Sequence, residues 1–201
     1  MKFNFLAKVR AFHLSAMLLL VLFASVPGYA SPITYSVNRT VGTGSVTGFI
    51  ETDGTLGVLS PSNIVNWSLS LFAPTSSPTT YVLDGPLSGN NSSVYMAGSD
   101  TTASATQLMF NFSGIDNGYL LFQYGVGIHD GFHYYCDATF SGICLSGETD
   151  APQYYTSGQV ATPSGNVVIG TATAVPEPGS LAMLATGVLA AAGAFRRKTK
   201  A

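Results

Sequence analysis

The stretch Val65-Asn-Trp-Ser-Leu-Ser-Leu-Phe72 alternates apolar and polar residues. Successive side chains of an extended chain point to opposite faces, so Val65, Trp67, Leu69 and Leu71 fall on one face and polar side chains on the other. An amphipathic helix would instead show apolar residues three and four positions apart. The stretch therefore predicts a β-strand with one buried face.

Similar patterns occur on both sides of this stretch. We expect further strands at residues 33–40, 45–50, 79–83, 92–97, 103–112, 119–124, 132–140, 154–160 and 167–173. Turn-forming residues separate them at Asp53-Gly54, Asp84-Gly85, Asn117-Gly118, Asp130-Gly131 and Ser164-Gly-Asn166. No stretch between the two ends of the chain has a convincing helical period. Short strands at this spacing predict an all-β body, an antiparallel β-sandwich or a jelly-roll-like fold.

The first 30 residues are organised like a secretory signal peptide. Met1–Arg10 is basic, Ala11–Ala24 is apolar, Pro27 breaks the helix, and small residues precede a cut between Ala30 and Ser31. We therefore expect an N-terminal signal helix that directs the chain to the export translocon.

The other end of the chain has the features of a membrane anchor. Val175-Pro176-Glu177-Pro178-Gly179 is followed by an uncharged apolar stretch and then by Arg196-Arg197-Lys198. As a helix, residues 179–195 would rise about 26 Å, close to the short end of membrane-spanning length. The bases would hold that end in the cytoplasm. We expect an exported body of residues 31–174 and a transmembrane anchor within residues 175–201.

This tail resembles the PEP-CTERM sorting signal of Gram-negative bacteria, also known as the "ice-binding protein C-terminal" domain. The resemblance covers about the last 27 residues. It implies that a membrane-embedded cysteine protease of the exosortase type recognises Pro176-Glu177-Pro178 and releases or transfers the body. Organisms with this system often make extracellular polysaccharide. Residues 44–59, continuing into Asn63-Ile-Val-Asn-Trp67, also resemble a recurrent body among PEP-CTERM proteins, which implies no activity.

Charge is distributed unevenly along the chain. Between residues 31 and 176 the sequence has nine acids and a single base, Arg39, so the formal charge of this part is −8. A surface without lysine cannot neutralise a phosphate backbone, which argues against nucleic-acid binding.

Cys136 and Cys144 are the only cysteines. Export takes them to an oxidising compartment, where two cysteines so close in sequence are expected to form a disulfide. The alternative is a metal or catalytic role beside His129 and His133.

The two histidines of His129-Asp-Gly-Phe-His133 have the spacing of zinc ligands only if they lie on a helix. Asp130-Gly131 disfavours a helix at this place. In a strand the two histidines would stand about 13 Å apart, unless a hairpin turn brings them together. We therefore expect two partly exposed histidines beside a turn and no metal. A calcium site could use four acids, Asp53, Asp116, Asp130 and Asp137. They lack the usual spacing of calcium ligands, and their sequence context suits turns better.

The sequence contains no nucleophile elbow and no phosphate-binding loop. A glycosidase with two carboxylates stays open, because the acids need only meet in space. Sugar-stacking candidates are Trp67, Tyr134-Tyr135 and Tyr154-Tyr155, although in adjacent pairs one ring should face the core.

We expect an exported, exosortase-processed surface or extracellular-matrix protein that associates with exopolysaccharide, without catalytic activity or cofactor. The alternatives are a secreted carbohydrate-binding or carbohydrate-active domain and a calcium-dependent adhesion module. The precursor would be anchored in the inner membrane before it reaches the cell surface or the medium.

Overall fold

The computed structural model describes residues 31–75, 79–125, 133–142, 144–145, 147–151, 159–173 and 187. The chain divides into two units, residues 1–30 and 31–201, and the description concerns the second. The predicted signal helix lies outside the described residues, and of the predicted C-terminal transmembrane helix only Gly187 is described. Within the described ranges, no helix has the length and apolar character needed to cross a membrane.

The described body consists of strands and one short 3-10 helix, which confirms the all-β prediction. The strands are β1 Ile33–Val41, β2 Gly44–Thr52, β3 Gly57–Val58, β4 Ile64–Phe72, β5 Thr80–Asp84, β6 Ser92–Ala97, β7 Thr101–Ala103, β8 Gln107–Asn111, β9 Tyr119–Tyr124, β10 Tyr134–Ala138, β11 Gly147–Ala151, β12 Gln159–Ala161 and β13 Asn166–Ala172, with the 3-10 helix η1 Pro61–Asn63 between β3 and β4.

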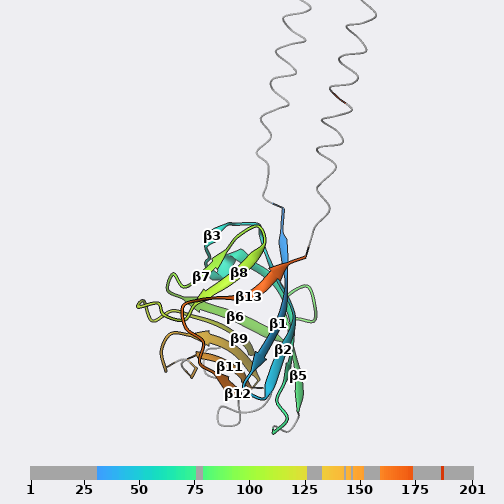
Figure 1. The fold of residues 1–201 in the computed structure, drawn as a ribbon. Coiled ribbons are helices and arrows are strands. Elements are labelled where there is room, and N and C mark those ends of the chain that lie inside the picture. Colours follow the sequence, from blue (N-terminus) through green and yellow to red (C-terminus); the bar gives the residue numbers. More distant parts are fainter. Residues whose placement is uncertain are drawn as a thin grey trace, which may run out of the picture. The chain divides into compact units, whose positions relative to one another are not determined.

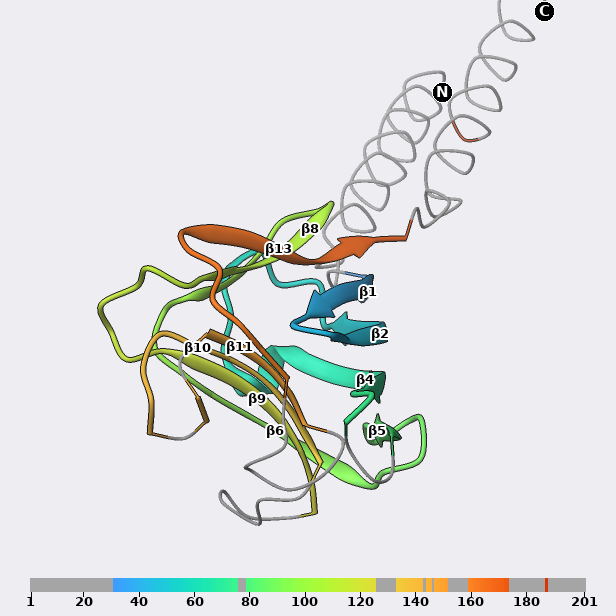
Figure 2. The same cartoon turned by 60° about the horizontal axis from the view of Figure 1, so that its bottom comes forward.

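These strands form two antiparallel sheets in a sandwich-like arrangement (Figures 1 and 2). The large sheet has the order β3-β7-β8-β13-β1-β2-β4-β5, and the small sheet has the order β12-β11-β10-β9-β6. β11 contacts β1, β2 and β4, so it runs across the large sheet rather than along one of its strands. Leu120, Phe122 and Tyr135 of the small sheet share one apolar core with residues of the large sheet.

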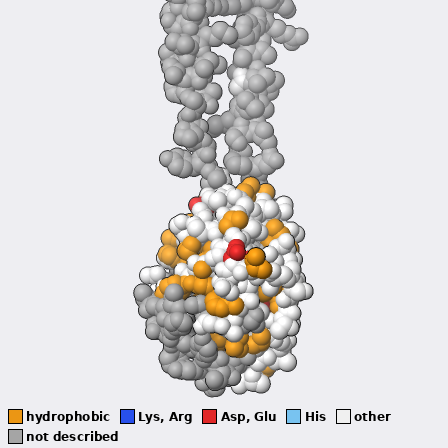
Figure 3. Space-filling model, turned by 90° about the vertical axis from the view of Figure 1, so that its left-hand side faces the viewer, with side chains coloured by type: hydrophobic (Ala, Val, Ile, Leu, Met, Phe, Trp, Pro, Cys, Tyr) orange, Lys and Arg blue, Asp and Glu red, His pale blue; other side chains and the backbone are white. Residues whose placement is uncertain are grey.

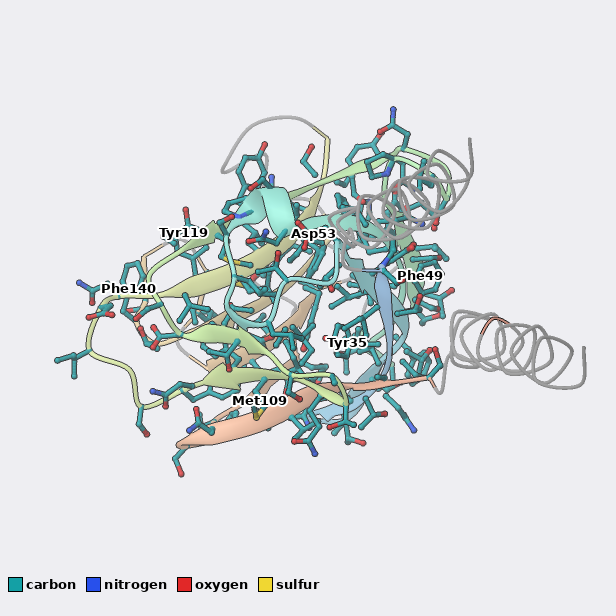
Figure 4. All side chains as sticks on the ribbon, turned by 90° about the horizontal axis from the view of Figure 1, so that it is seen from above. Tyr35, Phe49, Asp53, Met109, Tyr119 and Phe140 are labelled. Atoms are coloured by element: carbon teal, nitrogen blue, oxygen red, sulfur yellow. A yellow bond between two sulfur atoms is a disulfide. The ribbon has the colours of Figure 1, made fainter. Side chains whose placement is uncertain are left out.

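The large sheet follows the alternation that the sequence predicts. β1 and β2 are in register from Ile33 to Val41, and Figure 4 shows Tyr35 and Phe49 on opposite sides of this sheet. In β4, Trp67, Leu69 and Leu71 are buried as predicted. Val65 is only half-buried, because the register between β2 and β4 skips it.

The small sheet differs from the prediction in its boundaries. The expected strand at 132–140 begins only at Tyr134, since His133 has a left-handed backbone with φ of 50°. β11 was not predicted, because its sequence Gly-Glu-Thr-Asp-Ala lacks apolar alternation. In the large sheet, the expected strand at 103–112 is two strands, β7 and β8, joined by a turn in which the Ser104 amide donates to the Gln107 carbonyl at 2.8 Å.

Candidate functional site

Arg39, the only base between residues 31 and 176, points from β1 into the space between the sheets. Its inward neighbours on the strand, Val37 and Val41, belong to the core. The guanidinium makes two parallel hydrogen bonds to Glu148 of β11, from Nε to Oε1 at 2.8 Å and from Nη2 to Oε2 at 2.7 Å. Glu148 is fully buried, so this ion pair joins the two sheets in a low-dielectric environment.

Two further polar residues of β10 surround Glu148. The hydroxyl of Tyr135 donates to Glu148 Oε1 at 2.8 Å. Asp137 lies opposite Glu148 in the β10–β11 register and is fully buried, and no donor among the described residues reaches either of its carboxylate oxygens. Burial, followed by the negative charge of Glu148, raises the pKa of Asp137 well above its ordinary value. Tyr135 and Arg39 lower this pKa but do not offset the increase. Glu148 is therefore paired with Arg39, whereas Asp137 favours its neutral form.

A charged and a neutral carboxyl side by side is the division of roles that acid–base catalysis uses. Here, however, neither Asp137 nor Glu148 has any exposed surface. Substrate cannot touch either group in this conformation. The arrangement is suited to holding the sheets together.

A pocket of about 240 Å³ opens where β1 and β13 separate. It is lined by Ser36, Asn38 and Arg39 of β1 and by residues 168–171 of β13. The Arg39 side chain is 22% exposed even though it points inward. The buried cluster therefore meets solvent at this pocket through Arg39.

Cys136 and Cys144 form the predicted disulfide, with their Cα atoms 6.5 Å apart. Both residues are buried. They lie in a second, smaller core that covers the other face of the small sheet, together with Leu121, Tyr134, Ala138 and Ala151. The pair is therefore structural rather than catalytic or metal-binding in this structure.

The two histidines of the possible zinc motif cannot be compared, because His129 lies outside the described residues. The His133 ring stacks on Tyr81, with the ring centroids 3.6 Å apart and the planes 2° from parallel. Tyr124 meets both rings edge-on at 5.8 Å. No group of three or more potential metal-binding side chains occurs within the described ranges.

The candidate calcium ligands do not converge. Asp53 accepts hydrogen bonds from Asn63 Nδ2 at 3.0 Å and from the Thr55 amide at 2.9 Å, and these bonds lower its pKa. Asp116 accepts from Ser99 Oγ at 2.5 Å, and Asp137 lies between the sheets. Asp130 lies outside the described residues. Asp53 and Asp116 thus serve turns and loops, as their sequence context indicates.

The sequence does not reveal the role of Asp100. This residue is 4% exposed, and burial, followed by the charge of Asp116, raises its pKa. A Cβ atom at either Gly114 or Gly118 would overlap its carboxylate oxygens. The carboxylate therefore packs closely against the backbone, within a glycine-lined cradle.

The predicted sugar-stacking aromatics are buried where they are described. Trp67 donates from Nε1 to Ser92 Oγ at 2.8 Å and packs against Phe122. Tyr134 and Tyr135 are both buried, so the expectation that one of them faces out is wrong. The second core covers the face on which Tyr134 would otherwise be exposed. Tyr154-Tyr155 lies outside the described residues.

The PEP-CTERM protein-sorting motif matches residues 174–198. The chain carries a PEP-CTERM sorting signal. This match confirms the predicted resemblance and implies an exported protein that exosortase targets, with a membrane-anchored precursor. No curated protein and no solved structure matches the chain.

The individual residues predicted to act in sorting lie outside the described part of the chain. They are Ala30 of the signal cleavage site, Val175-Pro176-Glu177-Pro178-Gly179 of the processing motif and Arg196-Arg197-Lys198 of the membrane stop. Of this set, only Ser31 is described, and it is exposed at the start of the body.

Proposed function

We propose that this PEP-CTERM protein is a non-catalytic surface or extracellular-matrix protein that associates with exopolysaccharide after exosortase processing. The outer face of the large sheet is the observation that carries the proposal. Its registers place one side chain from each of six strands in a row: Gln107, Thr171, Ser36, Phe49, Ser68 and Asp84.

This row suits a polyhydroxyl ligand. At a strand spacing of about 4.8 Å, six strands extend over about 24 Å, a length that fits an extended glycan chain. Hydroxyl and amide groups dominate the row, and Phe49 adds an aromatic ring of the kind that stacks on sugars. A parallel row of Asn38, Thr47, Ser70 and Val82 has similar chemistry. Figure 3 shows another face of the body, likewise without Lys or Arg among its coloured side chains.

The absence of catalysis is part of the proposal. Its support is the complete burial of Asp137 and Glu148, the one pair of carboxyls that lie opposite each other in register within the described strands. The engagement of Asp53 and Asp116 in turns favours this function over calcium-dependent adhesion.

Processing is tested with Pro176→Ala and Glu177→Ala. A proline disfavours helix at its own position and at the residue before it, so the sequence Pro-Glu-Pro favours the extended backbone that a protease cleft accepts. We expect each variant to be exported but to stay at precursor size in a blot of cell fractions. Pro163→Ala, which changes a proline of the body, is the control and should mature normally. Maturation of both tail variants to normal size would contradict exosortase processing at this motif.

Matrix association is tested by sedimenting the native protein with exopolysaccharide from the producing strain, with and without calcium. We expect co-sedimentation in both conditions. Binding only with calcium would favour the adhesion module, and release of reducing sugar would favour an enzyme. Absence of co-sedimentation in both conditions would refute the proposed association.

A further inference from the structure

We propose that the pocket between β1 and β13 binds one neutral, hydroxyl-bearing sugar residue of the polysaccharide. This inference rests on the proposed function and adds a site and a ligand class to it. The sheet opens at this place because β1 and β13 stop pairing there.

The pairing of β1 with β13 stops after two residue pairs, Tyr35 with Ala172 and Ser36 with Thr171. Continued register would place Arg39 opposite Val168. Instead, β13 has an irregularity between Val168 and Gly170, and Arg39 Nη1 donates to the Val168 carbonyl at 3.2 Å. A side chain thus replaces the backbone partner, and the two strands remain apart (Figure 2).

The pocket offers hydrogen-bonding groups that the described protein does not use. The side chains of Ser36, Asn38 and Thr171 are exposed, and none of them hydrogen-bonds another described residue. The Arg39 guanidinium has five N–H donors, of which one each on Nε, Nη1 and Nη2 is engaged. Two donors remain at the base of the pocket. Mixed donors and acceptors of this kind match sugar hydroxyls.

The charges favour a neutral ligand. Glu148 already compensates Arg39 through two hydrogen bonds, and Asp137 lies close behind the pair. Besides Arg39, the body contains no Lys or Arg but nine acidic side chains, so its net negative charge repels a polyanion. A uronate carboxylate would bring a further negative charge toward two buried acids, whereas a hydroxyl group would not.

The size and surroundings of the pocket indicate one sugar residue within a longer chain. Pockets for drug-sized ligands begin at roughly 300 Å³, and this one is about 240 Å³. Ser36 lies in the pocket wall and is also the register partner of Phe49 on β2. A glycan with one residue in the pocket would therefore continue over the Phe49 ring and along the outer row.

The test measures co-sedimentation of the full chain, kept in a detergent without a sugar headgroup, with exopolysaccharide from the producing strain. Thr171→Trp fills the pocket from an exposed strand position. Thr80→Trp is the matched control, because Thr80 is an exposed strand threonine on β5 that lies neither in the pocket lining nor in either of the two outer rows. Asn38→Ala removes an amide and has Thr80→Ala as its control. Thermal melting checks that each variant is folded.

We expect binding to weaken about ten-fold or more for Thr171→Trp and about three- to ten-fold for Asn38→Ala, as for lost hydrogen bonds. Both Thr80 variants should change the binding less than two-fold. In competition, neutral hexoses should displace the polysaccharide and uronates should not.

Each outcome bears on one of the two proposals. If the wild type binds and Thr171→Trp binds equally well, the pocket assignment is wrong and the proposed function stands. Displacement by uronates alone would overturn the neutral ligand class. If the wild type does not bind the polysaccharide, the proposed function fails, and the pocket proposal fails with it.

Discussion

The two sheets bury their faces differently. The large sheet has one face on the core and one face in solvent, so β1, β2 and β4 alternate between apolar and polar residues. The small sheet is covered on both faces, and every residue of β10 is buried. The comparison shows that alternation predicts strands where one face is solvated and loses this power where both faces are covered.

The difference also decides where charge and chemistry lie. The small sheet places Asp137 and Glu148 against the inner face of the large sheet, where Arg39 compensates them. Its other face carries the disulfide within the second core. Apart from Arg39 and a few buried residues such as Thr52 and Asn66, the large sheet carries its polar side chains on its outer face. The polar groups of the small sheet thus hold the body together.

The largest effect should come from breaking the link between the sheets. Arg39→Met leaves Glu148 buried without its counter-ion, which should lower the free energy of unfolding by about 3–5 kcal/mol. Urea denaturation of the wild type and variant measures this difference. The double variant Arg39→Met/Glu148→Leu should recover most of the loss, because no uncompensated charge remains. If the single and double variants are equally unstable, the uncompensated charge of Glu148 is not the cause of the lost stability.

A smaller effect should follow from removing the disulfide in the second core. Replacing both Cys136 and Cys144 by Ala releases a short loop and should cost about 2–3 kcal/mol by chain entropy. Hydrogen exchange should show the loss mainly in β10 and β11, with β1 and β2 little changed until global unfolding. Equal loss of protection in both sheets at low denaturant would contradict the local role of the second core.

An effect that depends on pH should come from Asp137→Asn. Because the folded-state pKa of Asp137 is raised, the native state binds this proton more tightly than the unfolded state does. Stability from this site is fully present below the ordinary carboxyl pKa and is lost as pH rises toward the folded value. Each pKa unit of difference corresponds to about 1.4 kcal/mol.

The wild type should therefore lose stability relative to Asp137→Asn over the range from about pH 4, the ordinary carboxyl pKa, upward. Unfolding free energies measured across this range give the difference. Glu51→Gln, on the large sheet, is the control and should follow the wild type. Parallel curves for the wild type and Asp137→Asn would show that the buried carboxyl does not hold its proton.

Much of the large sheet could be predicted from local pattern. The strand around Trp67 and the strands β1 and β2 follow from alternation. The disulfide follows from two cysteines in an exported chain. The candidate site could not be predicted, because Arg39, Tyr135 and Glu148 come from three strands that meet only through the packing of one sheet on the other.

By itself, the amino-acid sequence determined the destination of this protein and its all-β class. Sorting signals are read as short linear segments, and strand alternation is a property of adjacent residues, so neither depends on distant contacts. Only the tertiary structure decided which polar residues are buried, where the β1–β13 ladder opens and which face of the body remains available. Those properties depend on groups far apart in the chain, whose burial and charge exist only once the two sheets have packed.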